Sequence, residues 1–515
     1  MTTTAPTGLT PSQLRWLMSG LLIGLFLSST EQSVVATALP TMAGELGGAN
    51  RIAWVVSAYL LTSTVSTPLY GKMSDLFGRR IVYQTSIVVF LVGSVLCALA
   101  PTLNQLVAAR AVQGLGGGGL MSLAFVIVGD VVSPRERGRY IGVFTTVFTL
   151  SSITGPLWGG LLVDGPGWRW VFWSVVPLSA VALVVANRGL RLPFATTRRP
   201  IDWAGIALLV VAATGLILVP IWGGSTYPWS SWQLLTTAGI GVAGSALFVA
   251  QEARAVEPII PLRLFTDRTI VAVFIMGFAL MAALLTVTTF MPFFLQVATG
   301  VSATRSGLLL TPQSIGVSLA ATLSGLAVTR TGRYKWTMLT GSGLAVVALV
   351  GLTTIDADTG ALGLAPLLFC LGAGLGLVFP NLTLSVQNAA AVHDLGIATS
   401  TSNFFRSMGG AFGAAAAGAI LTARLDEALL ERLGADRLSE VGGAEGLIRS
   451  PRVVRGLPEE LQSVIVGAVT DSVVGVIRWA VPIMAVVFLV AALVRESPLR
   501  TSSTIGGDDQ ERARS

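Results

Sequence analysis

The segment "GKMSDLFGRR" at residues 71–80 concentrates its charge, including Asp75 and Arg79, in a short stretch that contains two glycines. It lies between two apolar stretches, "AWVVSAYLLTSTVSTPLY" at 53–70 and "IVYQTSIVVFLVGSVLCALA" at 81–100. A membrane-spanning helix needs about 20 predominantly apolar residues. The segment is therefore expected to be a tight charged connection between two spans, with glycine supplying the turn.

The composition of the whole chain indicates an integral membrane protein. Of its 515 residues, 53% are hydrophobic and 11% are charged, whereas soluble domains carry about 25% charged residues. The net charge of +7 does not indicate a nucleic-acid partner, because the basic residues fall in short loops between apolar runs. Cys97, Cys370 and the single histidine, His393, lie far apart in the chain, so we expect no metal site, no cofactor and no enzyme.

The apolar runs predict an all-α fold with fourteen transmembrane helices. Helices are expected rather than open strands because every backbone polar group must be satisfied within lipid. We expect two six-helix bundles and two inserted central helices. The predicted helices cover 14–40, 52–71, 81–100, 103–128, 138–162, 169–187, 203–222, 233–252, 269–296, 304–328, 334–353, 362–388, 396–422 and 474–495.

Basic residues gather in alternate short loops, which the positive-inside rule places in the cytoplasm together with both termini. The long segment 423–473 is then extracellular, and we expect it to be a small ordered cap that could contact a periplasmic or cell-envelope partner. The predicted organisation is a cytoplasmic tail at 1–13, a bundle at 14–187, the inserted helices with their linkers at 188–268, a second bundle at 269–495 that includes the loop, and a cytoplasmic tail at 496–515.

The chain contains an internal sequence repeat. "GLAVTRTGRYK" at 325–335 repeats the spacing of "GKMSDLFGRRI" at 71–81, with Gly325 at the place of Gly71. Two related halves around a site near the membrane midplane are a common design of secondary transporters.

Two charges lie deep within predicted spans. Glu31 and Arg110 are each expected about 10–14 Å inside the outer boundary, at 1.5 Å per helical residue. A charge at mid-membrane costs about 2.5–3.5 kcal/mol on insertion scales, so such residues are usually paired and functional. Glu31 could be a proton or cation site, or the two residues could form a static bridge between helices.

Four stretches together resemble the major facilitator superfamily, and within it the fourteen-span drug:proton antiporters. "GKMSDLFGRR" is similar to the motif between helices 2 and 3, and "STEQSVVATALP" at 29–40 resembles the helix 1 signature of the fourteen-span group, with Glu31 where aspartate is common. "LVAARAVQGLGGG" at 106–118 resembles the helix 4 motif through Arg110, Gln113, Gly114 and Gly116. "SSITGPLWGG" at 151–160 resembles the antiporter motif of helix 5 through Gly155, Pro156, Gly159 and Gly160, with Ser151 replacing the first glycine.

The charged connection has two possible roles. Its side chains could form a cytoplasmic gate whose ion pairs exist only when that side is closed, or they could merely anchor the loop at the membrane surface. Asp75 has no role in anchoring and favours the gate. The candidate gate residues are Gly71, Asp75, Gly78, Arg79, Arg80 and Asp130.

The glycine–proline stretch of helix 5 is expected to bend the helix and seal the interior against proton leak, which favours exchange over symport. The alternative is ordinary small-residue helix packing. Several aromatic side chains could line a cavity for flat apolar cations, or they could simply pack. Arg406, in "FFRSMGGAFGAA", could line the cavity, close a gate or bond helix-end carbonyls. The cavity candidates are Gln32, Phe144, Phe148, Phe290, Phe294, Phe405 and Arg406.

These observations and the resemblance predict a proton-driven exporter of amphiphilic or cationic drug-like compounds that works by alternating access. The expected setting is the cell inner membrane, the expected partners are protons, membrane lipids and small-molecule substrate, and a monomer is expected. Export of lipids or lipid precursors is the alternative within transport. A non-transporting membrane sensor or scaffold is the alternative outside it.

Overall fold

The computed structural model describes most of the chain as helix. It describes residues 10–46, 52–189, 200–223, 227–301, 303–356, 359–440, 447, 454 and 457–499. Within these residues the only β feature is an isolated bridge between Gly223 and Tyr227. The helices of the first part are α1 (Pro11–Leu46), α2 (Ala53–Phe77), α3 (Arg79–Leu99), α4 (Leu103–Val131), α5 (Pro134–Asp164), α6 (Arg169–Trp173) and α7 (Val175–Gly189).

The second part begins with α8 and α9 and continues to the end of the described chain. Its elements are α8 (Trp203–Trp222), α9 (Trp232–Glu252), η2 (Leu262–Phe265), α10 (Arg268–Ala298), α11 (Ala303–Leu309), α12 (Thr311–Thr331), α13 (Lys335–Leu352), α14 (Ala361–Ala389), η3 (Val392–Asp394), α15 (Leu395–Glu440) and α17 (Glu459–Leu493).

Side-chain caps mark several helix starts. The Thr102 side chain accepts a hydrogen bond from the Gln105 backbone N–H, which opens α4. Asp202 does the same for the Gly205 N–H at the start of α8, at 2.8 Å. Such caps satisfy backbone donors that have no partner within the helix. Short polar connections can therefore end one apolar helix and begin the next.

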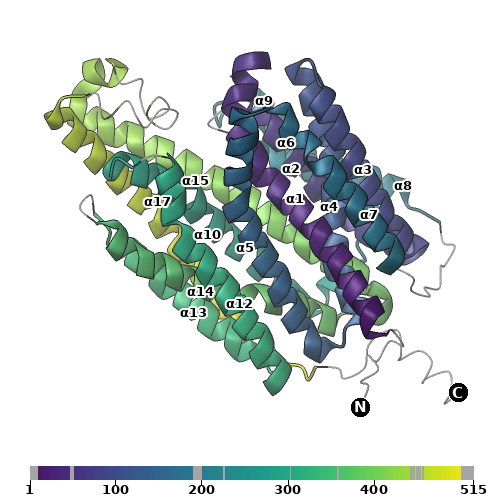
Figure 1. The fold of residues 1–515 in the computed structure, drawn as a ribbon. Coiled ribbons are helices and arrows are strands. Elements are labelled where there is room, and N and C mark those ends of the chain that lie inside the picture. Colours follow the sequence, from purple (N-terminus) through teal and green to yellow (C-terminus); the bar gives the residue numbers. More distant parts are fainter. Residues whose placement is uncertain are drawn as a thin grey trace, which may run out of the picture.

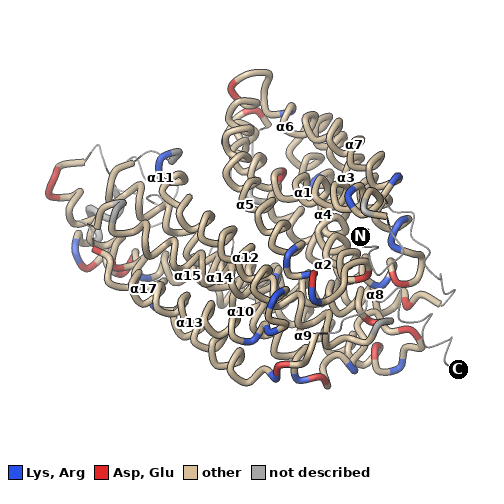
Figure 2. Tube along the Cα trace, turned by 60° about the horizontal axis from the view of Figure 1, so that its bottom comes forward, with Lys and Arg blue, Asp and Glu red and all other residues tan. Residues whose placement is uncertain are grey.

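Thirteen helices among the described residues are long and apolar enough to cross a membrane. In that set α6 and α7 form one span, and so do α11 and α12. The remaining long helix, α2, is not among the thirteen. It is rich in serine and threonine and carries Lys72 and Asp75. Figure 2 shows the charged residues mostly near helix ends, with uncharged residues along the helix middles.

The helices form two groups that converge toward one end of the molecule (Figure 1). In the first group, α1 packs along α5 and α7, and α4 packs against α2 and α3. In the second, α10 packs against α15 and α17, and α14 against α12 and α13. The helices α8 and α9 pair with each other, and α8 also contacts α2 and α15. In Figure 1 the upper ends of the two groups diverge, whereas α1 begins and α17 ends toward the lower end.

Close contacts between the two groups lie toward this lower end, which we call the terminal end. A Cβ added to Gly71 of α2 would lie 1.9 Å from the Ser400 Oγ of α15. A Cβ added to Gly325 of α12 would lie 2.2 Å from the Gly138 carbonyl oxygen of α5. Neither position has room for a larger residue. The terminal end is therefore closed.

The expectation of a loop over 423–473 was wrong for much of its length. The helix α15 continues to Glu440, with non-helical dihedrals at Gly434 (φ 79°), and α17 already begins at Glu459. Arg432 and Asp471 pair across the two extensions at 2.5 Å. A helix outside the lipid can carry charges, so the end of the apolar run did not mark the end of the helix. The middle of this segment lies almost entirely outside the described residues, and so do 1–9 and 500–515 of the predicted tails.

Candidate functional site

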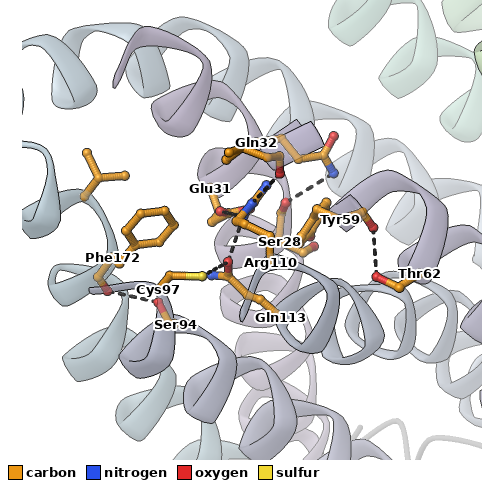
Figure 3. A network of polar contacts seen from close by, with 12 residues as sticks. Ser28, Glu31, Gln32, Tyr59, Thr62, Ser94, Cys97, Arg110, Gln113 and Phe172 are labelled. Carbon is orange, nitrogen blue, oxygen red and sulfur yellow. Dashed lines mark hydrogen bonds and ion pairs between the residues drawn. The ribbon is translucent and has the colours of Figure 1, made fainter. Parts of the chain in front are cut away.

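Glu31 of α1 and Arg110 of α4 meet as a buried ion pair inside the first group of helices (Figure 3). The Arg110 Nη1 donates a hydrogen bond to the Glu31 Oε1. The Glu31 side chain is 0% exposed and the Arg110 side chain is 1% exposed. The structure therefore brings together the two deep charges that the sequence singled out.

The Arg110 guanidinium has several partners besides Glu31. Its Nε donates to the Val55 carbonyl oxygen at 2.9 Å, and its Nη1 donates to the Gln113 Oε1 at 2.7 Å. The guanidinium carbon also lies 4.4 Å from the ring centroid of Tyr59. Charge-assisted hydrogen bonds and a cation–π contact offset the cost of burying this cation. Arg110 is thus held from α1, α2 and its own helix.

One carboxylate oxygen of Glu31 is left over. Among the described residues, the Glu31 Oε2 has no hydrogen-bond partner. A cavity of about 20 Å³ borders Glu31 and is lined also by Trp158 of α5, Val171 of α6 and Ser174, which lies between α6 and α7. A cavity of roughly 10–15 Å³ already admits a water molecule. Glu31 therefore has one carboxylate oxygen without a partner and borders a space large enough for one water.

The packing of α5 against α1 helps to position Glu31. The Ser151 hydroxyl oxygen accepts hydrogen bonds from the hydroxyls of Ser29 and Thr30, at 2.8 and 2.9 Å. A Cβ added to Gly155 would lie 2.4 Å from the Ser33 Cβ, and one added to Gly159 would lie 2.1 Å from the Thr37 Oγ1. Serine and glycine together let α5 approach the helix that carries Glu31.

The other two residues of this motif do not take part in that contact. Gly160 has no atom within 4 Å of the place where a Cβ would stand, and Pro156 is exposed. The helix α5 runs from Pro134 to Asp164 with Pro156 inside it. A role of this motif in sealing against proton leak stays a prediction.

The glycine of the helix 4 motif has a packing role. A Cβ added to Gly114 would lie 2.5 Å from the Tyr59 carbonyl oxygen. The close approach of α2 to α4 at this point brings the Tyr59 ring over Arg110. The adjacent Gln113 is fully buried and accepts a hydrogen bond from the Cys97 thiol at 3.6 Å. Gln32, on α1, is exposed and donates to the Ser28 carbonyl oxygen at 3.5 Å.

At the terminal end, Arg79 forms the centre of a charge cluster. Its guanidinium lies 2.5 Å from the Asp75 Oδ1 and 2.6 Å from the Asp130 Oδ2. It also donates to the Ser74 hydroxyl. Gly78 ends α2 and begins α3 with φ 88°, a conformation that favours glycine. The expectation that residues 71–80 form the connection was therefore wrong for most of its length, because α2 continues through Gly71 to Phe77 and α3 begins at Arg79. Arg80 points elsewhere and donates to Asn187 of α7.

This cluster lies at the contact between the two groups of helices. A Cβ added to Gly396 of α15 would lie 2.3 Å from the Asp75 Oδ1 and 2.8 Å from the Arg79 Nη1. The exposed Arg135 of α5 also donates to the carbonyl oxygens of Thr329 and Arg330 of α12. The predicted gate residues Asp75 and Asp130 therefore both pair with Arg79, close to where α2 and α15 meet.

Sequence reasoning missed that the linker between α9 and α10 joins this end of the molecule. Lys72 of α2 pairs with Glu257 of the linker at 2.9 Å. Arg263 of the linker donates to both carboxylate oxygens of Asp394, just before α15, at 2.8 and 2.7 Å. These hydrogen bonds raise the pKa of the Arg263 guanidinium. In the sequence, Arg263 counted only as one of the basic residues that mark a cytoplasmic loop, and its pairing with Asp394 was not predicted.

The aromatic cavity candidates are divided between the two groups of helices. Phe294 is fully buried among apolar side chains of the second group, and Phe144 is buried in the first group, 5.4 Å from Phe125. Phe405 stacks on Phe274 at 5.0 Å. Phe148 and Phe290 are half-buried and pack at the edges of the two apolar cores.

Arg406 of α15 is the second arginine buried deep in a span. Its relative exposure is 8%. The guanidinium carbon lies 5.3 Å from the ring centroid of Phe379 of α14 and 6.0 Å from that of Phe125 of α4. Among the described residues, the Arg406 Nε has no hydrogen-bond partner. Bonding to helix-end carbonyls, one of the roles considered from the sequence, has no support in these contacts.

A family comparison settles the class of protein. Residues 21–414 match the model of the Major Facilitator Superfamily. The chain belongs to this superfamily. It is therefore a multi-pass membrane protein that transports small molecules, and not an enzyme.

Other members of the superfamily resemble this one along most of its length. The chain is 38% identical over 417 residues to the Multidrug transporter protein MdtP of Bacillus subtilis (strain 168), covering 81% of this chain and 77% of that protein. It is 32% identical over 485 residues to Multidrug resistance protein 3 of the same organism, covering 93% and 94%.

The fold is shared with solved superfamily structures. The structure of the proton:xylose symporter XylE bound to 6-bromo-6-deoxy-D-glucose aligns with a TM-score of 0.62, at 12% identity, over 96% of this chain and 98% of that one. At this identity the likeness concerns the fold alone. Sequence reasoning missed four aromatic residues of the present chain that lie beside its buried charges. Tyr59 lies beside Arg110 and Trp158 lines the cavity at Glu31, whereas Phe125 and Phe379 lie beside Arg406. In the sequence all four look like ordinary apolar residues of spans.

Proposed function

We propose that this protein is a fourteen-span drug:proton antiporter that exports amphiphilic or cationic drug-like compounds. The observation that carries the proposal is the buried pair of Glu31 and Arg110, in which one carboxylate oxygen has no partner and Glu31 borders a water-sized cavity. Such a carboxylate has a cation to hold it ionised and a place from which a proton can arrive. The names of the two Bacillus subtilis relatives support drugs as the cargo.

In this proposal α2 is the fourteenth span, and the two groups of helices are six-helix bundles with α8 and α9 inserted between them. The terminal end faces the cytoplasm of a cell inner membrane, because basic residues such as Arg79, Arg135 and Arg263 gather in its connections. The structure is then outward-facing, closed at the cytoplasmic end and splayed at the other.

Coupling would follow from the change of charge at Glu31. While Glu31 is ionised, its attraction to Arg110 ties α1 to α4. A proton that arrives from the outer side through the cavity and binds Glu31 removes this attraction and leaves Arg110 with its other partners. Only a ligand with different affinity for the two states can shift the equilibrium between them. The proton has this property if Glu31 is ionised in one state and neutral in the other.

The gate supplies the second half of the cycle. Opening toward the cytoplasm would separate α2 from α15 and would have to rearrange the contacts around Arg79. Each proton that moves inward at 100 mV contributes about 2.3 kcal/mol. Since a factor of ten in concentration corresponds to about 1.4 kcal/mol, one proton could sustain a substantial gradient of an uncharged substrate.

The proposal is tested in inside-out membrane vesicles with rhodamine 123 and a pH indicator. The wild type is expected to accumulate the dye when a proton gradient is imposed, and to release protons when dye is added. Glu31→Gln is expected to lose both effects but to retain dye binding and dye exchange across the membrane. Glu45→Gln is the matched control, because Glu45 lies near the end of the same helix with a side chain 54% exposed.

A Glu31→Gln variant that still accumulates dye against a gradient would overturn the coupling role of Glu31. If the wild type moves no dye but transfers fluorescent phospholipid between leaflets, lipid export replaces drug export. If it moves neither, the transport proposal as a whole fails.

A further inference from the structure

We infer that Arg406 binds an anionic group of the substrate, so that the substrates include amphiphilic acids with a carboxylate, phosphate or phenolate on a flat apolar body. The inference rests on the proposed export function and specifies its substrate class. It concerns the second group of helices, whereas the proton site lies in the first.

The position of Arg406 is the first argument. It lies within the long helix α15, and its Cγ would be 2.9 Å from a Cβ added to Gly277 of α10. Its guanidinium is near Phe379 of α14 and Phe125 of α4. The charged group is therefore surrounded by helices of both groups and is nine-tenths buried.

The second argument is that this cation is buried without a matching anion. Arg79 has two carboxylate partners, Arg110 has Glu31, and Arg137 donates to the carbonyl oxygens of Val132 and Gly129. In the part of the chain that the structure describes, no hydrogen bond or ion pair to Arg406 is found, and its Nε is buried without a partner. A buried charge is costly unless it is paired. A bound anion would supply the negatively charged partner that the Arg406 guanidinium lacks.

The third argument is that other unpartnered polar groups lie on the same helix face. Thr399, Asn403 and Arg406 are separated by four and three residues, which places them on one side of α15. Within the described residues, the Thr399 Oγ1 and the Asn403 Nδ2 are buried and have no hydrogen-bond partner. Along the helix the three residues span about 10 Å at 1.5 Å per residue. Asn403 Nδ2 and the guanidinium can only donate, which selects a ligand rich in acceptor oxygens.

The fourth argument concerns the aromatic neighbours. Phe125 lies at an edge-on angle to Phe144, and its own carbonyl oxygen accepts a hydrogen bond from Gln387 of α14 at 2.9 Å. The rings of Phe125 and Phe379 thus flank Arg406 from two different groups of helices. A flat apolar body would pack on these rings while its acid meets the guanidinium. Binding would then depend on how the two groups are placed, as alternating access requires.

The test uses two dyes on one xanthene scaffold, anionic fluorescein and cationic rhodamine 123, with the full-length protein in lipid nanodiscs. Binding of each dye is measured by fluorescence anisotropy for the wild type, Arg406→Gln and Arg406→Lys. Arg406→Gln is expected to weaken fluorescein binding at least tenfold and to change rhodamine binding less than threefold. Arg406→Lys is expected to restore most of the fluorescein affinity. Arg330→Gln, at an exposed position near the end of α12, is the control for the loss of one positive charge.

The outcomes separate this inference from the proposed function. If wild-type vesicles accumulate rhodamine under a proton gradient but Arg406→Gln binds both dyes as the wild type does, the inference is overturned and export stands. Equal loss of both dyes in a folded Arg406→Gln protein would also overturn it, because it would show a role in packing or switching. If Arg406→Gln does not fold, Asn403→Leu takes its place and is expected to weaken fluorescein alone, about threefold. An Asn403→Leu variant with unchanged fluorescein binding overturns the inference.

Discussion

Arg110 and Arg406 are both arginines buried within spans, one in each group of helices, yet their surroundings are opposite. Arg110 is bonded to Glu31, Gln113 and a backbone carbonyl and lies over the ring of Tyr59. Arg406 has two aromatic rings nearby and no acid bonded to it among the described residues. The charge of Arg110 is therefore neutralised by an acid of the protein, whereas in our proposal the charge of Arg406 is neutralised by a bound ligand.

This difference suggests a division of labour between the two groups of helices. An internally paired charge can change only when its own partner gains or loses a proton, which suits coupling. An uncompensated charge changes its energy when a ligand arrives, which suits recognition. The two proposals therefore make opposite predictions for equivalent substitutions.

The largest effect is expected from breaking the paired arginine. Arg110→Gln leaves the Glu31 carboxylate buried without its cation, and removing one partner of a buried ion pair typically costs about 3–5 kcal/mol. A marked fall in the apparent melting temperature of the purified protein is expected, together with loss of dye efflux.

A double substitution serves as the control. Glu31→Gln combined with Arg110→Gln removes both charges, so its melting temperature is expected to lie nearer to the wild type than that of Arg110→Gln. If the double variant is less stable than the single one by a further comparable amount, the two residues act independently and the pair does not have the role assigned to it.

Arg406→Met is expected to act in the opposite direction. Methionine keeps an unbranched apolar stem against Gly277, but it removes a cation whose burial costs about 2.5–3.5 kcal/mol on insertion scales. The melting temperature without ligand is therefore expected to rise or stay the same, while stabilisation by added fluorescein disappears. A destabilisation as large as that of Arg110→Gln would show that Arg406 is internally paired after all, and the contrast between the two arginines would be lost.

The pairing of Glu31 with Arg110 could be predicted from the sequence, whereas the isolation of Arg406 could not. Two opposite charges expected at a similar depth in the first half have a strong physical reason to meet. Whether Arg406 has a partner depends on the relative placement of α4, α10, α14 and α15, which no periodicity reveals. The class of fold followed from composition, since so few charges in so long an apolar chain suit only a membrane.

Helix limits outside the membrane were harder to predict for a related reason. The apolar run marks the part of a helix that lies in lipid, but α15 and α17 continue beyond it with charged residues such as Arg432 and Asp471. The contact between the linker and α2 through Lys72 and Glu257 was missed too, because a single opposite charge far along the chain has many possible partners.

A third arginine extends the comparison to the gate. Arg79 is paired like Arg110, but its acids lie where the two groups of helices meet, so its removal is expected to shift the conformational equilibrium. Arg79→Gln should favour opening of the terminal end by about tenfold, or roughly 1.4 kcal/mol. Arg80→Gln is the matched control, because Arg80 lies next to Arg79 but donates to Asn187 of α7 and should have little effect.

The shift can be measured as a distance between spin labels at the exposed positions Arg139 of α5 and Arg330 of α12, in a background without native cysteines. A longer distance is expected to gain population in Arg79→Gln and not in Arg80→Gln. Equal distributions in the two variants would limit the charged connection to the anchoring role considered from the sequence.

The smallest change in stability is expected at two adjacent glycines of α5, Gly159 and Gly160. Both belong to the same sequence motif, but only Gly159 packs closely against α1. Gly159→Ala places a Cβ 2.1 Å from the Thr37 Oγ1 and 2.9 Å from the Val34 carbonyl oxygen, so α1 must move, at a cost of about 1–3 kcal/mol. Gly160→Ala meets no atom within 4 Å and should stabilise the helix by up to about 1 kcal/mol.

Because α1 carries Glu31 and not the Arg406 site, Gly159→Ala should weaken proton-driven rhodamine accumulation while fluorescein binding in nanodiscs stays unchanged. If both dyes bind less tightly, the two buried arginines are coupled through α1 and the division of labour between the halves is not as clean as their contacts indicate.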